Sequence, residues 1–161
     1  DLDIRKGTLS RLFKLKKTGM TNFLADNSIR VDDVIQRGEQ FDIIASGTVA
    51  PNPAELLMDE RLDELVNELR SRYDYIIADS VPVGIIADAT ITNRIADLTV
   101  FVARAGKLDR RQLPDIEQLY QEKKLKNMAI VLNGADFRHR YGYRYYGYYG
   151  NYNYGANKKK K

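Results

Sequence analysis

Four short segments rich in isoleucine and valine constrain the fold more than any other feature of this 161-residue chain. They are FDIIAS (41–46), YDYIIAD (73–79), LTVFVARA (98–105) and MAIVLNG (128–134). Their apolar residues are nearly continuous rather than alternating, which is typical of parallel strands covered on both faces. Helical patterns separate them, so the sequence predicts crossover units and an α/β fold, a three-layer αβα sandwich with a mainly parallel sheet.

The helical pattern between the first two predicted strands is the clearest. It covers residues 53–72, with Asn52 as the expected N-cap and Pro53 at the first helical position. The apolar residues that recur on one face of this helix are Met58, Leu62, Leu65, Val66 and Leu69. Residues 88–96 and 109–126 supply two further predicted helices.

Charge divides the chain into two parts. The whole chain carries a net charge of +4, but residues 137–161 hold seven Lys or Arg and no Asp or Glu, so residues 1–136 sum to −3. We therefore expect a mildly acidic domain over 1–136 and a flexible, basic, tyrosine-rich tail over 137–161. The chain has no cysteine, which excludes disulfides and thiolate metal sites.

Acidic residues stand at the ends of two predicted strands, which is where α/β folds carry their functional residues. Asp79 ends an apolar strand, a Walker B-like pattern in which a carboxylate holds Mg²⁺ beside nucleotide phosphates. An Asp in this place is also a common turn former. Asp1 and Asp3 alternate, so in an extended segment they face one side, where they could hold Mg²⁺ and accept a proton. A solvated strand edge with an internal ion pair is an equally acceptable interpretation.

Five features, in this order along the chain, resemble one family. They are DLDIR, SGTVAPNPAELL, YDYIIADSVPVG followed by ADA, the strand IVLNG, and a terminal tyrosine cluster. Together they resemble the bacterial protein-tyrosine kinases (BY-kinases) of the polysaccharide co-polymerase systems. The resemblance covers essentially the whole chain and implies a P-loop ATPase fold related to the MinD and ParA proteins.

The resemblance implies a role for particular residues. DLDIR would be the second Walker motif, Walker A′, in which Asp3 organises Mg²⁺ and Asp1 is the candidate base toward an incoming tyrosine hydroxyl. Asp79 would be the Walker B carboxylate, holding Mg²⁺ through water, and Asn133 stands where relatives place an adenine contact. The phosphoacceptors would be the eight tail tyrosines Tyr141, Tyr143, Tyr145, Tyr146, Tyr148, Tyr149, Tyr152 and Tyr154.

The chain departs from the family at the phosphate-binding loop. It contains no G-x-x-x-x-G-K-[ST], although the phosphate site of this fold depends on the backbone N–H groups and the lysine of that loop. We therefore expect a chain truncated before Walker A′, which binds ATP and Mg²⁺ poorly and is inactive as it stands. A smaller departure is Ser80-Val81 after Asp79, where the family usually has Thr-Pro.

By this resemblance the chain is expected to be an ATP-dependent protein-tyrosine autokinase domain that regulates capsular or exopolysaccharide synthesis and export. A neighbouring subunit in a ring-shaped homo-oligomer would phosphorylate the tail. Further implied partners are a membrane activator region, in the same or a separate chain, and the polysaccharide export machinery. The implied location is the cytoplasmic side of the bacterial inner membrane. The fragment itself is expected to be soluble, because no apolar run approaches the ~20 residues that span a bilayer.

Other functions remain open from the residues alone. A non-catalytic phosphoacceptor or regulatory module would use the same fold to present its tail. A MinD/ParA-like ATPase would share the Walker motifs, but phosphoacceptor tyrosines have no role in that switch. Nucleic-acid binding through stacked tyrosines is not expected, because the acidic domain offers no basic surface to extend the contact.

Overall fold

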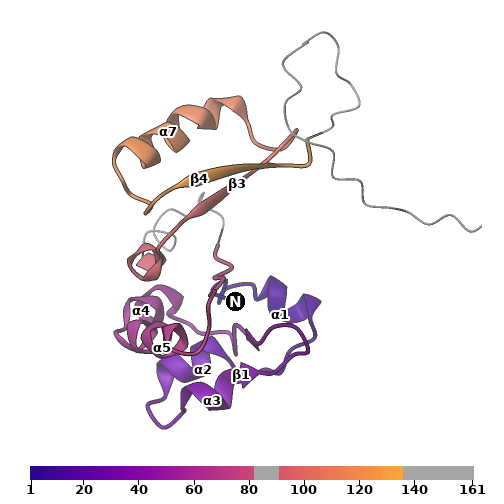
Figure 1. The fold of residues 1–161 in the computed structure, drawn as a ribbon, viewed down its shortest axis with the longest axis vertical. Coiled ribbons are helices and arrows are strands. Elements are labelled where there is room, and N and C mark those ends of the chain that lie inside the picture. The colour runs from indigo at the N-terminus through magenta and orange to yellow at the C-terminus, as the bar shows by residue number, and fades with distance from the viewer. Residues whose placement is uncertain (82–90, 136–161) are drawn as a thin grey trace, which may run out of the picture.

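The computed structural model describes residues 1–81 and 91–135 (Figure 1). Its elements are α1 (Thr8–Leu12), α2 (Met20–Ala25), α3 (Val31–Val34), β1 (Ile35–Gln36), β2 (Ile43–Ile44), α4 (Pro53–Met58), α5 (Arg61–Arg70), the 3₁₀ turn η1 (Asn93–Ile95), β3 (Val100–Arg104), the 3₁₀ turn η2 (Arg110–Gln112), α7 (Leu113–Gln121) and β4 (Ala129–Asn133). The predicted tail over 137–161, with its eight candidate phosphoacceptor tyrosines, lies outside the described residues.

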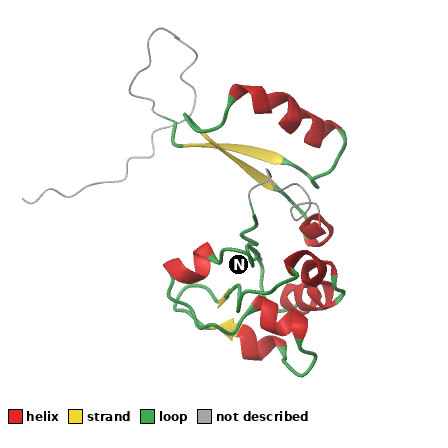
Figure 2. Ribbon diagram, turned by 180° about the vertical axis from the view of Figure 1, so that it is seen from behind, coloured by secondary structure: helices red, strands yellow, loops and turns green. Residues whose placement is uncertain are grey.

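The elements form two groups, which Figures 1 and 2 show from opposite sides. The first group contains the N-terminus, the helices α1 to α5 and the short β1–β2 pair. In the other group, α7 lies along one side of the β3–β4 pair. None of the helices in the described part of the chain is long and apolar enough to cross a membrane.

One apolar cluster holds the first group together. Its most deeply buried side chains are Val34 of α3, Leu57 of α4, and Leu62 and Leu65 of α5, and apolar residues of α2 belong to the same cluster. Of the five apolar residues predicted for the face of the 53–72 helix, four are buried in this cluster. The exception is Met58, which is exposed at the end of α4.

The single helix predicted over 53–72 is wrong, because the structure has two helices there. Asp59 takes an extended backbone conformation, and its Oδ1 accepts a hydrogen bond of 2.9 Å from the N–H of Arg61 at the start of α5. Arg94 donates to the carbonyl oxygens of Leu57 and Asp59 at 2.7 and 2.8 Å. The end of α4 is thus stabilised by a side chain that is distant in sequence, which supplies partners that the helix itself lacks.

The other predicted helices differ at their ends. The helix predicted over 109–126 is α7, which begins at Leu113 after the turn η2 and ends at Gln121. Of the helix predicted over 88–96, the structure describes only residues 91–96, which include η1.

The predicted parallel pairing is confirmed for β3 and β4. Val100 lies opposite Ala129 and Arg104 opposite Asn133. The strand predicted over 41–46 is reduced to β2, which pairs antiparallel with β1 instead of joining the parallel sheet. The next two residues, Ala45 and Ser46, contact α2 instead of a strand. Their carbonyl oxygens accept hydrogen bonds from the first two N–H groups of that helix.

The strand predicted over 73–79 is wrong for this structure. Tyr75 and Ile77 are 89% and 92% exposed, and no described strand pairs with the segment. It makes one sheet-like contact, a 2.7 Å hydrogen bond from the N–H of Leu2 to the carbonyl oxygen of Asp79. Strand propensity produces a strand only where a neighbouring strand is present to pair with it.

The third layer of the predicted sandwich is not present in the described residues. Val100, Val102 and Val131 lie on one face of the β3–β4 pair, and each is about half exposed. The opposite face carries Ala103, which is buried, and Ile130 and Leu132, which are 60% and 62% exposed. The described part of the second group is therefore a helix on a sheet, with two layers instead of three.

Candidate functional site

Asp1 and Asp3 lie in the first group, and each is only 8% exposed. The backbone nitrogen of Asp1 donates to the carbonyl of Ile44 in β2 at 2.9 Å, and that of Leu2 donates to the carbonyl of Asp79. The chain thus begins between β2 and the segment that ends at Asp79. Leu2 enters the apolar core, so the acidic side chains on either side of it face away from that core.

Within the described part of the chain, three hydrogen bonds hold the carboxylate of Asp1. Oδ2 accepts from the backbone N–H of Ser10 at 2.9 Å and from its hydroxyl at 2.6 Å. Oδ1 accepts from the N–H of Asp3 at 3.2 Å. A side chain with this many donors is fixed in orientation, which is what a general base needs.

Asp3 begins a turn that leads into α1. Its Oδ1 accepts from the N–H of Lys6 at 3.1 Å, and its carbonyl oxygen accepts from the N–H of Gly7 at 2.7 Å. Gly7 has a φ of 54°, and a Cβ at this position would lie 2.4 Å from the Oγ of Ser46. Glycine therefore allows both the turn and the close approach of the loop that follows β2.

Asp79 is close to the N-terminus of the chain, but its side chain is exposed. Burial lowers the pKa of the amino group of Asp1, and the negative charge of Asp79 opposes that effect. Asn133, the predicted adenine contact, ends β4 in the other group of elements, and its carbonyl accepts from the N–H of Ala105. The structure therefore brings Asp1, Asp3 and the backbone of Asp79 together, and it does not join Asn133 to them by a described hydrogen bond.

Asp3 and Asp79 carry carboxylate oxygens, which are suitable ligands for Mg²⁺, but they do not form a complete set of protein ligands around a metal site. Within residues 1–81 and 91–135 there is no group of three or more acidic or histidine side chains arranged to hold a metal. Nucleotide-bound Mg²⁺ needs only one or two protein carboxylates, since phosphate and water complete its shell. Asp3 and Asp79 supply oxygen ligands of that kind.

Ser10 and Ser46, which the sequence did not indicate as functional residues, complete the surroundings of Asp1. The hydroxyls of these two residues lie 3.1 Å apart, and the N–H of Ser46 donates to the Oγ of Ser10 at 2.8 Å. Ser46 precedes Gly47, which has a φ of 89°. The Ser-Gly pair after an apolar strand indicates a tight turn, but nothing local in the sequence indicates its contact with Ser10.

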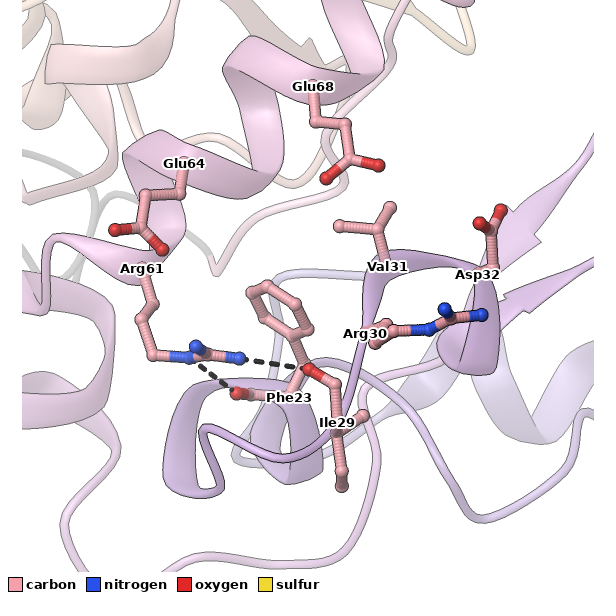
Figure 3. A pocket seen from close by; sticks show the side chains of 8 residues that line it. All are labelled: Phe23, Ile29, Arg30, Val31, Asp32, Arg61, Glu64 and Glu68. Atoms are coloured by element: carbon pink, nitrogen blue, oxygen red, sulfur yellow. Dashed lines mark hydrogen bonds between the residues drawn. The ribbon is translucent and has the colours of Figure 1, made fainter.

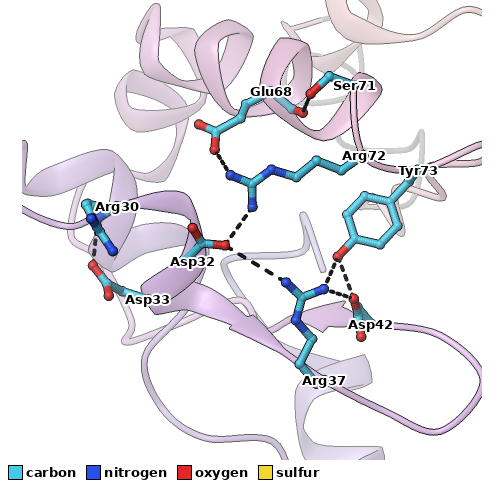
Figure 4. A network of polar contacts seen from close by, with 9 residues as sticks. All are labelled: Arg30, Asp32, Asp33, Arg37, Asp42, Glu68, Ser71, Arg72 and Tyr73. Carbon is cyan, nitrogen blue, oxygen red and sulfur yellow. Dashed lines mark hydrogen bonds and ion pairs between the residues drawn. The ribbon is translucent and has the colours of Figure 1, made fainter.

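A separate polar network joins the residues that follow α5 to α3 and to the β1–β2 hairpin (Figure 4). Tyr73 and Arg37 both bind Asp42, and Arg72 binds Asp32 at 2.6 Å. The hydrogen bond from Arg72 lowers the pKa of Asp32, and the hydrogen bond from Tyr73 lowers that of Asp42. These contacts position structural elements and lie outside the group formed by Asp1, Asp3, Ser10 and Ser46, called the Asp1 cluster below.

A pocket of about 360 Å³ also lies outside the Asp1 cluster (Figure 3). Its lining residues are Phe23, Ile29, Arg30, Val31, Asp32, Arg61, Glu64 and Glu68. The guanidinium of Arg61 lies 4.2 Å from the ring centroid of Phe23 and donates to the carbonyls of Phe23, Asp26 and Ile29. The main cation of this pocket therefore serves to join α5 to the end of α2, which favours a structural role.

Comparison with known proteins agrees with this architecture, although no family model matches the chain. CpsD, a tyrosine-protein kinase of Streptococcus pneumoniae, is 32% identical over 156 residues, which cover 94% of this chain and 68% of CpsD. YwqD, a tyrosine-protein kinase of Bacillus subtilis, is 34% identical over 91% of this chain and 63% of YwqD. The kinase domain of the Escherichia coli tyrosine kinase ETK superposes with a TM-score of 0.72 at 31% identity, covering 89% of this chain and 58% of that domain.

The parallel strands, their helices and this structural match define the class as an α/β domain of the P-loop NTPase fold. Within that class, the chain belongs to the bacterial tyrosine-protein kinase family, because its similarity to CpsD extends over nearly all of the chain. It spans 68% and 63% of the lengths of the two curated relatives and 58% of the solved kinase domain.

Proposed function

We propose that this chain is the part of an ATP-dependent protein-tyrosine kinase that supplies the base and the metal-binding carboxylates, and that its own tyrosine-rich tail is the substrate. The observation that carries the proposal is the similarity to a tyrosine-protein kinase over 94% of the chain. The hydrogen-bonded carboxylate of Asp1 supports it, because phosphoryl transfer depends chiefly on positioning and charge neutralisation.

Each acidic residue has a distinct role in this proposal. Asp1 accepts the proton of the tyrosine hydroxyl as its oxygen bonds to the γ-phosphorus and ADP leaves. Asp3 and Asp79 hold Mg²⁺, which neutralises charge on the phosphates. Asn133 contacts the adenine. The tail reaches the site of a neighbouring copy. As phosphates accumulate on the tyrosines, their negative charge offsets the positive charge of the seven Lys and Arg residues in the tail.

The proposed setting follows from the family. The kinase regulates capsular or exopolysaccharide synthesis and export from the cytoplasmic side of the bacterial inner membrane. Its partners are further copies in a ring, a membrane activator region and the export machinery.

The proposal is tested by phosphotyrosine formation with Mg-ATP. The chain lacks the G-x-x-x-x-G-K-[ST] motif, so the assay compares the chain alone with the chain preceded by a segment that carries such a loop, called here the loop-bearing protein. We expect phosphotyrosine in the tail of the loop-bearing protein and little in the chain alone. A loop-bearing protein that binds ATP and forms no phosphotyrosine would contradict the kinase proposal.

The same missing motif favours a second function, a phosphoacceptor module that a separate kinase modifies. The two functions separate when the chain is mixed with a loop-bearing protein whose eight tail tyrosines are replaced by phenylalanine. If the chain is a kinase domain, the added loop completes the site of the loop-bearing protein, which then phosphorylates the chain in this mixture. If the chain is a phosphoacceptor module, it stays unphosphorylated in this mixture and gains phosphate only from a separate, active kinase.

A further inference from the structure

Ser10 contacts the proposed base more closely than any other described residue, and neither the family resemblance nor the comparisons give it a role. Its backbone N–H and its hydroxyl both donate to the same oxygen, Oδ2 of Asp1, at 2.9 and 2.6 Å. Among the described residues, Oδ1 receives only the N–H of Asp3, at 3.2 Å. The two oxygens of Asp1 are therefore unequal, and Oδ1 keeps more capacity to accept a proton.

The single proton of the Ser10 hydroxyl determines which group is the donor in each of its hydrogen bonds. A serine hydroxyl has one proton and two lone pairs. The proton of Ser10 is given to Asp1, so its lone pairs must accept the remaining contacts, which are the N–H of Ser46 at 2.8 Å and the Oγ of Ser46 at 3.1 Å. Ser46 is therefore the donor in the contact between the two hydroxyls, and the hydrogen bonds run from Ser46 through Ser10 to Asp1.

Burial and close packing favour this chain of hydrogen bonds from Ser46 through Ser10 to Asp1. Ser46 and Asp1 are 5% and 8% exposed, so water competes little with the contacts. The absence of a Cβ at Gly7 allows Ser46 to approach, because a Cβ there would lie 2.4 Å from its Oγ. Helix α1, which carries Ser10, has no buried residue, so apolar packing does not explain its position.

We propose that Ser10, held by Ser46, is a positioning residue for Asp1: it fixes Oδ2 and so leaves Oδ1 as the oxygen that accepts the proton of the substrate tyrosine. The inference rests on the proposed kinase function. Ser10 does not touch the reacting atoms and acts through the orientation of Asp1. A misplaced base costs about a hundredfold when the error reaches roughly 1 Å.

The first test uses the chain as it is and needs no activity. NMR of the chain should show a slowly exchanging hydroxyl proton on Ser10, with a scalar coupling across the hydrogen bond to the carboxyl carbon of Asp1. Ser46→Ala should make that proton exchange faster. A Ser10 hydroxyl proton that exchanges as fast as that of an exposed serine would overturn the inference.

The second test measures tyrosine phosphorylation in the loop-bearing protein. We expect Ser10→Ala to lower kcat roughly tenfold to a hundredfold with little change in the KM for ATP. Ser10→Thr keeps both donors and should restore most of the rate. The matched control is Ser28→Ala, because Ser28 also donates its N–H and its hydroxyl to one oxygen of an aspartate, Asp26, but on an exposed loop.

The outcomes separate this inference from the proposed function. Wild-type activity with an equally active Ser10→Ala variant would overturn the role of Ser10 and leave the kinase proposal intact. Equal losses for Ser10→Ala and Ser28→Ala would also overturn it, since that result indicates a general effect on stability. A wild-type loop-bearing protein without activity would overturn the kinase proposal, and the positioning role of Ser10 with it.

Discussion

The hydroxyl of Tyr73 donates a hydrogen bond of 2.5 Å to Oδ2 of Asp42, a residue 31 positions earlier in the chain. Arg37 donates to the Tyr73 oxygen at 2.9 Å and pairs with the same carboxylate. Burial and the bond to Asp42 raise the pKa of Tyr73, and the bond from Tyr73 lowers the pKa of Asp42. The contact therefore depends on a protonated phenol and an ionised carboxylate.

The first prediction is a bell-shaped pH dependence of what this contact contributes. The lowered pKa of Asp42 adds stability above its ordinary value of 3.8, which is lost as the pH falls through the folded-state value. The raised pKa of Tyr73 adds stability below its ordinary value of 10.0, which is lost as the pH rises through the folded-state value. We expect Tyr73→Phe to lower Tm by a few degrees at neutral pH and by less beyond either limit.

Thermal unfolding of both proteins across this pH range measures the difference. Tyr75→Phe is the matched control, because Tyr75 is exposed and lies two residues away. A Tm difference for Tyr73→Phe that does not change with pH would contradict the prediction.

The sequence predicts the parts of this fold that local signals control. The helix start at Pro53 was predictable, because a fixed φ and a preceding Asn act within one turn. The strands β3 and β4 were predictable from their runs of Ile and Val, and each lies within its predicted range. Asp1 and Asp3 are buried, and Leu2 between them is hydrogen-bonded to the backbone of Asp79, but the catalytic and metal-binding roles that the sequence suggests for the three residues stay a prediction.

Contacts between distant residues control the rest. The break between α4 and α5 depends on Arg94, which lies 35 residues beyond Asp59. The segment 73–79 has the composition of a strand, but its state depends on a neighbour that propensity does not specify. The contact of Ser10 with Ser46 spans 36 residues and depends on the turn at Gly7. No local pattern in the sequence carries that information.

The second prediction concerns the acidic residues, and it rests on the kinase proposal. Asp1→Asn in the loop-bearing protein keeps an acceptor for Ser10 but removes the base, so kcat should fall roughly 10²- to 10⁴-fold with ATP binding retained. Asp79→Asn should instead raise the Mg²⁺ concentration needed for half-maximal rate. Initial rates against ATP and Mg²⁺ distinguish the two effects. An Asp1→Asn variant with the wild-type rate would exclude Asp1 as the base.

The third prediction compares two glycines with positive φ. A Cβ at Gly47 would lie 2.3 Å from the Oγ1 of Thr21 and 2.8 Å from the Oδ1 of Asn22, whereas Gly106 has open space around it. Gly106→Ala should cost about 1–2 kcal/mol for its left-handed backbone. Gly47→Ala should cost roughly 1–3 kcal/mol more, because crowding is added to the same strain. Urea unfolding measures both, and equal costs would contradict the close contact.

The fourth prediction tests the link between α5 and α2. Arg61→Gln removes donors to the carbonyl oxygens of Phe23, Asp26 and Ile29, and it removes the cation from the ring of Phe23. We expect the free energy of unfolding to fall by about 1–3 kcal/mol, since charged hydrogen bonds are lost. Arg30→Gln is the control, because Arg30 lines the same pocket with its side chain exposed. Equal effects of the two variants would contradict the structural role of Arg61.

The last prediction compares a buried and an exposed apolar side chain, and it tests the correction at 73–79. Leu65 is fully buried in the core, so Leu65→Ala should lower the free energy of unfolding by about 2–5 kcal/mol. Ile77 is 92% exposed, so Ile77→Ala should change it by less than about 0.5 kcal/mol.

The sequence pattern alone predicts a different result for Ile77, because a strand covered on both faces would bury it and make its truncation as costly as that of Leu65. Urea unfolding of the two variants therefore decides between the two descriptions of the segment. A loss above 2 kcal/mol for Ile77→Ala would show that this segment is a buried strand in solution and would overturn its exposed position here.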